Sequence, residues 1–161
     1  MPRLLIVYHT QTGGTRTLVD AALDGASTIS ETTTTLQRAA DTTAADVIAA
    51  DGLILATPEN FGTMSGMLKD FFDRVFYRCE TALVGRPYSV IVCAGGDGTG
   101  AMRDVDRIVT GWRMRKVHPG LIARRVGGMA GSSRGELDLA DVERAREIGT
   151  TLAAGLAYSV F

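Results

Sequence analysis

Residues 3–17 read RLLIVYHTQTGGTRT, which joins a strand-length apolar run to a loop of threonines and glycines. The run over residues 3–9 is continuous rather than alternating, which is typical of a strand buried on both faces of a sheet. The segment after the loop carries apolar residues at helical spacing, namely Leu18, Val19, Ala22, Leu23 and Ala26. This order of strand, polar loop and amphipathic helix predicts the first unit of an α/β fold.

The same alternation of strand-length and helix-period segments recurs five times along the chain. It predicts strands over residues 3–9, 32–36, 52–57, 87–94 and 121–126. It predicts helices over residues 18–26, 43–50, 64–76, 102–112 and 142–156. Right-handed crossovers leave few topologies, so we expect a five-stranded parallel sheet in the order 2-1-3-4-5, with helices on both faces in three layers. The threonine run at residues 32–35 is expected to be an edge strand.

Length and composition narrow the class of protein. The 161 residues suit one domain spanning 1–161, and 45% hydrophobic with 22% charged residues is ordinary for a globular chain. The net charge of -1 creates no field that would attract nucleic acid or a membrane. Cys79 and Cys93 are expected to stay reduced, and no targeting segment or span is apparent. We therefore expect a cytoplasmic protein without membrane or nucleic-acid partners.

The first loop, residues 10–17, has the form of a phosphate cradle. Hydroxyl groups can donate to phosphate oxygens, and two glycines let backbone N–H groups at the positive helix terminus approach closely. The loop has no lysine, which excludes the P-loop of nucleotide triphosphate sites. The competing interpretation is a turn with threonine caps. The residues concerned are Thr10, Thr12, Gly13, Gly14, Thr15 and Thr17.

The order Thr-x-Thr-Gly-x-Thr directly after the first strand resembles the FMN-phosphate loop of flavodoxins and NADPH-dependent FMN reductases. The resemblance implies a flavodoxin-like fold and a bound FMN. It also implies which residues bind the phosphate: Thr10, Gln11, Thr12, Gly13, Gly14 and Thr15. Arg16 is expected to add a positive charge to that group.

The second loop, residues 57–66, is similar to the corresponding segment of flavodoxin-like NAD(P)H:quinone reductases and FMN reductases. A flavin ring needs an apolar or aromatic wall and backbone donors near N5, which makes Phe61 the predicted wall. The competing interpretation places Phe61 in the core. Glu59 is expected to anchor the loop or an interface, because flavin hydride chemistry needs no side-chain acid or base. The cofactor contacts implied here are Pro58, Glu59, Asn60, Phe61, Gly62 and Thr63.

The third loop, residues 93–100, looks like the flavin-pyrimidine loop of the same families. Its glycines would let backbone groups meet the polar edge of a flat ring. The resemblance assigns that contact to Ala94, Gly95, Gly96, Asp97 and Gly98. Residues 96–101 also match the dinucleotide fingerprint, but no acidic residue follows between residues 108 and 135. We interpret this match as a coincidence.

Basic residues outnumber acidic ones by eight to two over residues 103–134. They would form a docking patch for the 2′-phosphate of NADPH or for an acidic protein, or else a solvated face balanced by acidic neighbours. The basic residues are Arg103, Arg107, Arg113, Arg115, Lys116, Arg124, Arg125 and Arg134.

The resulting hypothesis is an FMN-binding oxidoreductase that passes electrons from NADPH or NADH to a quinone, a free flavin or a similar small molecule. No metal is expected, because His9 and His118 have no partners at ligand spacing. The alternative is a flavodoxin-type one-electron carrier, and a module without cofactor is a third class. Near-neutral charge and the loop over residues 58–66 favour the reductase. The reductase resemblance further implies a homodimer or homotetramer.

Overall fold

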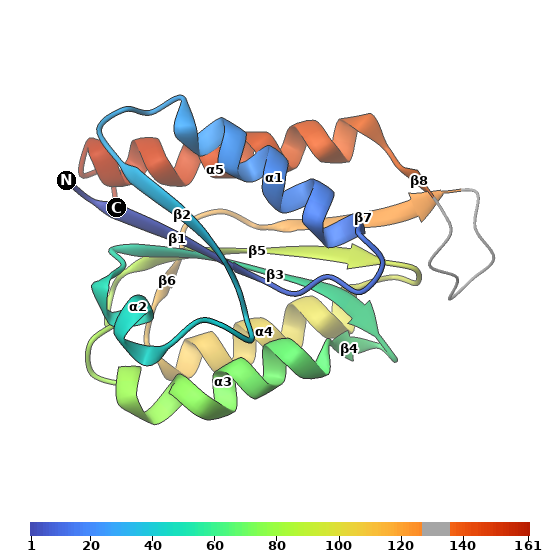
Figure 1. Cartoon of the computed structure of the whole chain (residues 1–161), viewed down its shortest axis with the longest axis horizontal. Helices are drawn as coiled ribbons and strands as arrows, with labels where there is room; N and C mark the ends of the chain where they lie inside the picture. Colours follow the sequence, from blue (N-terminus) through green and yellow to red (C-terminus); the bar gives the residue numbers. More distant parts are fainter. Residues whose placement is uncertain (127–135) are drawn as a thin grey trace.

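Parallel strands form the middle layer of the molecule in a computed structural model, which describes residues 1–126 and 136–161 (Figure 1). The main strands lie in the order β2-β1-β3-β5-β7, with every neighbouring pair parallel. This confirms the predicted order 2-1-3-4-5, and it places the threonine-rich strand at the sheet edge. The bounds are β1 Arg3–Tyr8, β2 Thr33–Arg38, β3 Gly52–Asn60, β5 Pro87–Ala94 and β7 Leu121–Val126.

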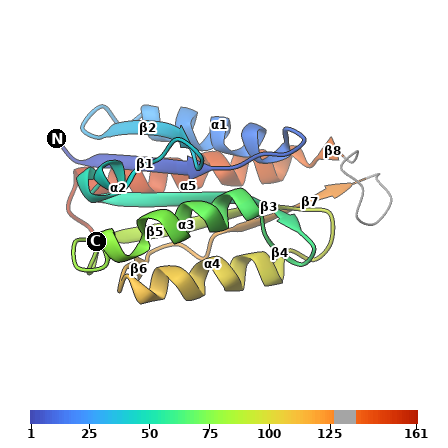
Figure 2. The same ribbon diagram turned by 60° about the horizontal axis from the view of Figure 1, so that its bottom comes forward.

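Helices cover both faces of this sheet. On one face lie α1 (Gly14–Ser27) and α5 (Leu139–Ala157), and on the other lie α2 (Ala44–Ala49), α3 (Gly66–Cys79) and α4 (Thr99–Gly111) (Figures 1 and 2). Each face buries its own apolar cluster against the sheet. β5 is buried at every position, which explains why it appears in the sequence as a continuous apolar run.

Aromatic side chains fix α3 against α4. Trp112 is fully buried at the end of α4, and its ring stacks on Phe76 with centroids 5.5 Å apart. Its indole N–H donates to the Phe76 carbonyl at 3.0 Å, which satisfies the one polar group of that side chain. These contacts hold the C-terminal end of α4 against α3.

Three short strands were not predicted. β4 (Thr63–Met64) pairs antiparallel with β3, β6 (Arg115–Lys116) pairs parallel with β5, and β8 (Glu136–Leu137) pairs antiparallel with β7. The most important difference concerns β3, which was expected to end at residue 57 but runs on to Asn60. Pro58 suggested an end, yet it lies at the last pair of the β3–β5 ladder, where its missing N–H interrupts little.

Among the described residues, no helix has the length and apolar character needed to cross a membrane. Cys79 and Cys93 are both buried thiols and are not joined to each other.

Candidate functional site

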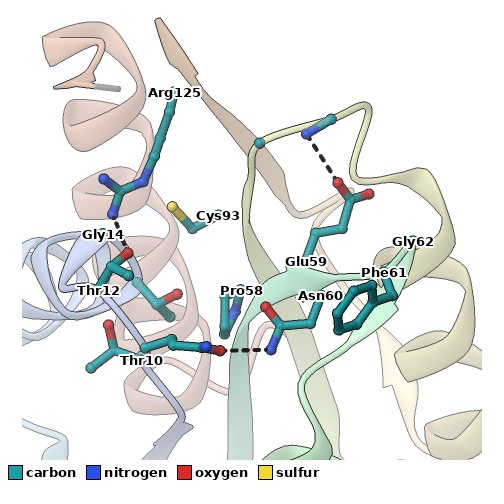
Figure 3. A pocket seen from close by; sticks show the side chains of 14 residues that line it. Thr10, Thr12, Gly14, Pro58, Glu59, Asn60, Phe61, Gly62, Cys93 and Arg125 are labelled. Carbon is teal, nitrogen blue, oxygen red and sulfur yellow. Dashed lines mark hydrogen bonds between the residues drawn. The ribbon is translucent and has the colours of Figure 1, made fainter. Parts of the chain in front are cut away.

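The carboxyl ends of β1, β3 and β5 meet at one edge of the sheet, where a pocket of about 560 Å³ opens (Figure 3). This volume is within the range of small-molecule and cofactor sites. All three loops singled out in the sequence contribute to it. The predicted residues that line it are Thr10, Gln11, Thr12, Gly14, Thr15, Pro58, Glu59, Asn60, Phe61, Gly62, Gly95 and Gly96.

The first loop turns into α1 through Gly13. This residue has φ +99° and is the N-cap of the helix, and its backbone N–H donates to Thr10 Oγ1 at 3.0 Å. A glycine offers no side chain to cap the helix, and the first turn of α1 contains no acidic residue. The positive end of the helix therefore meets the pocket without a negative side chain from its own first turn. Gly13 does not line the pocket but shapes the turn that does.

Thr15 carries the most informative polar atom of the pocket. The residue is only 1% exposed, and its Oγ1 has no hydrogen-bond partner within residues 1–126 and 136–161. Leaving a buried hydroxyl unsatisfied costs about 1–3 kcal/mol. Because Thr15 also lines the pocket at the start of α1, its hydroxyl is placed to donate to an anionic ligand there. The cradle therefore fits a phosphate group.

The second loop is a tight hairpin between β3 and β4, not an open loop. Phe61 and Gly62 form its two-residue turn, with φ of +53° and +76°. A left-handed backbone costs about 1–2 kcal/mol in a residue other than glycine. Phe61 is also 106% exposed, so its interpretation as a core residue is wrong. A strained, fully exposed aromatic side chain beside a pocket indicates a role in binding.

Glu59 joins this hairpin to the third loop. Its Oε1 accepts from the Gly96 backbone N–H at 3.1 Å, and its Oε2 accepts from the Gly98 N–H at 2.7 Å. These contacts agree with the predicted anchoring role. The carboxylate thus holds the third loop against the hairpin.

Two further contacts hold the hairpin in place. Asn60 Nδ2 donates to Gln11 Oε1 at 3.0 Å, which connects the second loop to the first (Figure 3). Thr63 does not line the pocket, because its hydroxyl donates to Asp104 Oδ2 on α4 at 2.7 Å. Hydrogen bonds therefore tie the hairpin to the first loop and to α4 as well as to the third loop.

We expect Glu59→Gln to loosen the third loop without unfolding the protein. The amide keeps one acceptor but turns an NH₂ group toward a backbone N–H, so one hydrogen bond is lost. Because the contact is partly exposed, the free energy of unfolding should fall by about 1 kcal/mol. Amide hydrogen exchange at Gly96 and Gly98 should become faster. Glu80→Gln, at the end of α3, controls for the loss of charge, and unchanged exchange in Glu59→Gln would contradict the anchoring role.

Three third-loop residues that were predicted to contact the cofactor do not line the pocket, namely Ala94, Asp97 and Gly98. Ala94 is fully buried in the core. Asp97 Oδ1 accepts from the backbone N–H and hydroxyl of Thr99 at 2.8 and 2.7 Å, and these bonds lower the pKa of the Asp97 carboxyl. Gly98 has φ +72° and is the N-cap of α4. Of the glycines in this loop, Gly95 and Gly96 line the pocket, whereas Gly98 lies at the start of α4.

Arg16 was expected to add charge to the phosphate, but it does not line the pocket. Its Nε donates to Asp20 at 2.8 Å, and its Nη1 donates to the Tyr8 hydroxyl at 3.0 Å. Arg16 and Asp20 form an i,i+4 ion pair along α1, a common arrangement on a helix surface. The side chain is therefore engaged along the helix.

Two pocket residues were missed in the sequence, Cys93 and Arg125. Arg125, on β7, donates from Nη2 to Thr12 Oγ1 at 3.1 Å. Burial raises the pKa of the Cys93 thiol, and Arg125 opposes part of that rise. The carboxyl-end rule for parallel sheets could have pointed to Arg125, because it lies at the end of the fifth parallel strand.

The basic segment over residues 103–134 is distributed over several elements. Arg103 pairs with Asp104 at 3.0 Å, and Lys116 pairs with Asp106 at 2.6 Å. These ion pairs favour a balanced face at both positions. Arg134 lies outside the described residues. Among the residues that are described, no three His, Cys, Asp or Glu side chains gather as metal ligands would.

Residues 17–124 match the family described as NADPH-dependent FMN reductase. A flavodoxin from Aquifex aeolicus is 32% identical over 100 residues, which are 62% of this chain and 54% of that protein. An NAD(P)H dehydrogenase (quinone) from Acidithiobacillus ferrooxidans is 30% identical over 113 residues, or 57% of this chain and 56% of that protein. The chain thus spans about half the length of the curated relatives it matches.

Solved structures share the fold at low sequence identity. A WrbA-like flavodoxin from Agrobacterium tumefaciens has a TM-score of 0.76 and 19% identity, covering 99% of both chains. Flavodoxin 1 from Bacillus cereus has a TM-score of 0.77 and 17% identity, covering 96% of this chain and 99% of that one. Both confirm the flavodoxin-like fold.

Proposed function

The chain belongs to the NADPH-dependent FMN reductase family, and we propose that it is an oxidoreductase with one FMN in the pocket at the carboxyl ends of β1, β3 and β5. The observation that carries this proposal is the buried, unpartnered Oγ1 of Thr15 at the start of α1, as judged within the described residues. A phosphate at that position would satisfy both the hydroxyl and the helix N-terminus. The exposed Phe61 offers an apolar surface in the same pocket.

The chain's residues divide the work of holding FMN. The start of α1, with Thr12 and Thr15, would bind the phosphate. Phe61 would cover the ring, and backbone groups of Gly95 and Gly96 would meet its polar edge. FMN, when bound, supplies the electron-transfer chemistry at its ring. The protein's part is to orient that ring and to limit its contact with water.

We further propose NADPH or NADH as the electron donor, and a quinone, a free flavin or a similar small molecule as the acceptor. The family supports NADPH as the electron donor. The quinone dehydrogenase among the relatives supports a quinone as the acceptor.

The second candidate is a one-electron carrier, which the flavodoxin among the relatives favours. The two functions make different demands on the flavin. A carrier must stabilise the half-reduced flavin so that electrons leave singly, whereas a reductase must accept a hydride from a nicotinamide.

Anaerobic stopped-flow absorbance distinguishes the two functions. We expect NADPH or NADH alone to bleach the bound FMN, and a quinone or free flavin then to restore its absorbance over many turnovers. If neither nucleotide bleaches the flavin, while a one-electron donor yields a stable half-reduced spectrum, the protein is a one-electron carrier and the proposed reductase activity is wrong. If the protein does not bind FMN at tens of micromolar, the proposed cofactor is wrong.

A further inference from the structure

We propose that Arg125 makes the pocket selective for flavins that carry a terminal phosphate. The inference deepens the proposed function and rests on it, because it concerns the same FMN pocket. It assigns the positive charge of the phosphate site to the end of β7 instead of to Arg16 on α1.

The first step is the position of the guanidinium. Arg125 Nη2 donates to Thr12 Oγ1 at 3.1 Å, so the side chain reaches from the fifth parallel strand across to the first loop (Figure 3). A Cβ at Gly14 would lie 2.9 Å from Arg125 Cζ and 2.6 Å from Cys93 Sγ. The glycine therefore permits the guanidinium to lie directly against the first turn of α1.

The second step is electrostatic. The guanidinium lies beside the positive end of α1, a helix whose first turn has no acidic residue. Two positive groups at close range repel each other, and an anion that contacts both of them is attracted by both. The buried Oγ1 of Thr15 lies at the same helix start and has no partner among the residues described. A helix terminus, a guanidinium and a buried hydroxyl thus converge on one anion site.

The third step concerns the ligand. A guanidinium can donate two parallel hydrogen bonds to a phosphate, and these bonds are charge-assisted. Riboflavin has the same ring but no phosphate, so it gains nothing from Arg125. The residue should therefore set the preference for FMN over riboflavin, while Phe61 acts on both ligands alike. The carboxylate of Glu59 is directed to the third loop and is bound there by Gly96 and Gly98.

The test compares FMN and riboflavin binding to wild type and Arg125→Gln, measured by flavin fluorescence quenching. The dissociation constant of FMN should rise about 10-fold to 150-fold, as expected for the loss of a charged hydrogen bond. That of riboflavin should change less than about twofold. The salt dependence of FMN binding should also weaken, because a charge pair has been removed. Arg125→Lys should recover part of the affinity, since it restores the charge without the planar fork.

Arg16→Gln is the matched control. It removes an arginine near the start of α1, where Arg16 bonds to Asp20 and Tyr8. Its FMN affinity should stay within about twofold of wild type. Unchanged FMN binding in Arg125→Gln overturns the proposal. So does an equal loss of FMN and riboflavin binding, because a merely structural role would weaken both.

Inorganic phosphate separates this inference from the FMN function. Titrated into the ligand-free protein, it should shift the amide resonances of Gly14 and Thr15, with weaker binding in Arg125→Gln. If wild type binds phosphate there but no flavin, the proposed cofactor fails and the anion site stands. If phosphate leaves both resonances unmoved, the role of Arg125 in an anion site is refuted.

Discussion

Thr15→Val should stabilise the ligand-free protein and weaken FMN binding at the same time. Valine has nearly the shape of threonine, so packing is kept while the buried, unpartnered hydroxyl is removed. The free energy of unfolding without ligand should rise by about 1–2 kcal/mol. The same change removes a hydrogen bond to a charged group, worth about 1.5–3 kcal/mol, so the FMN dissociation constant should rise about 10-fold to 150-fold. Urea unfolding and FMN titration measure the two effects.

Thr17→Val provides the matched control for this experiment. Thr17 lies in the same loop, but its hydroxyl donates to the Gly13 carbonyl at 3.2 Å and is exposed. The control variant should keep its FMN affinity. If Thr15→Val destabilises the ligand-free protein and leaves FMN binding unchanged, the hydroxyl serves the fold and not a phosphate.

Phe61→Asn should also raise stability while it lowers affinity. Asparagine adopts the left-handed backbone more readily than phenylalanine, and the exposed ring makes no buried contact to lose. The ligand-free protein should gain about 1 kcal/mol, or about 2–4 °C in Tm. Loss of the aromatic wall should weaken FMN by about 30-fold to 100-fold, the equivalent of roughly 2–3 kcal/mol for a covered aromatic side chain. Thermal unfolding and FMN titration measure these changes.

Arg113→Asn tests the relief of backbone strain separately from the loss of the aromatic side chain that would cover FMN. Arg113 has φ +57° in the turn after α4, so asparagine there relieves a similar strain without changing a pocket residue. It should raise stability and leave FMN affinity unchanged. Phe61→Tyr keeps both the aromatic ring and the left-handed backbone strain, so its stability and FMN affinity should resemble those of wild type. If Phe61→Asn binds FMN as wild type does, Phe61 does not cover the flavin.

The sheet order followed from the sequence because its central strands β1, β3 and β5 are mostly buried. Residues 3–9 and 87–94 have no period-2 polar positions, and such runs occur in parallel sheets between two helical layers. The hairpin was not predicted for a local reason. Phe61 and Gly62 do form a two-residue turn, but Pro58 earlier in the same segment indicates the end of a strand. The pairing register of β3 with β5 decides where β3 ends, and this register depends on the tertiary structure.

The three loops could be predicted because each has its own local composition. The contact between Arg125 and Thr12 could not be predicted, because the two residues are 113 positions apart in the chain. Arg16, which was predicted to add charge to the phosphate, does not line the pocket, and the sequence contains a local reason for this. Asp20 lies four residues further along the same helix, and this spacing predicts a surface ion pair.

The carboxylate of Glu59 also constrains how this protein can diverge among its relatives. A Cβ added at Gly96 would lie 2.8 Å from Glu59 Oε1, so a larger residue there would displace the carboxylate from the loop. Positions 59 and 96 should therefore change together during evolution. Lineages that keep glutamate at position 59 should keep glycine at position 96, whereas lineages with a side chain at position 96 should carry a shorter residue at position 59.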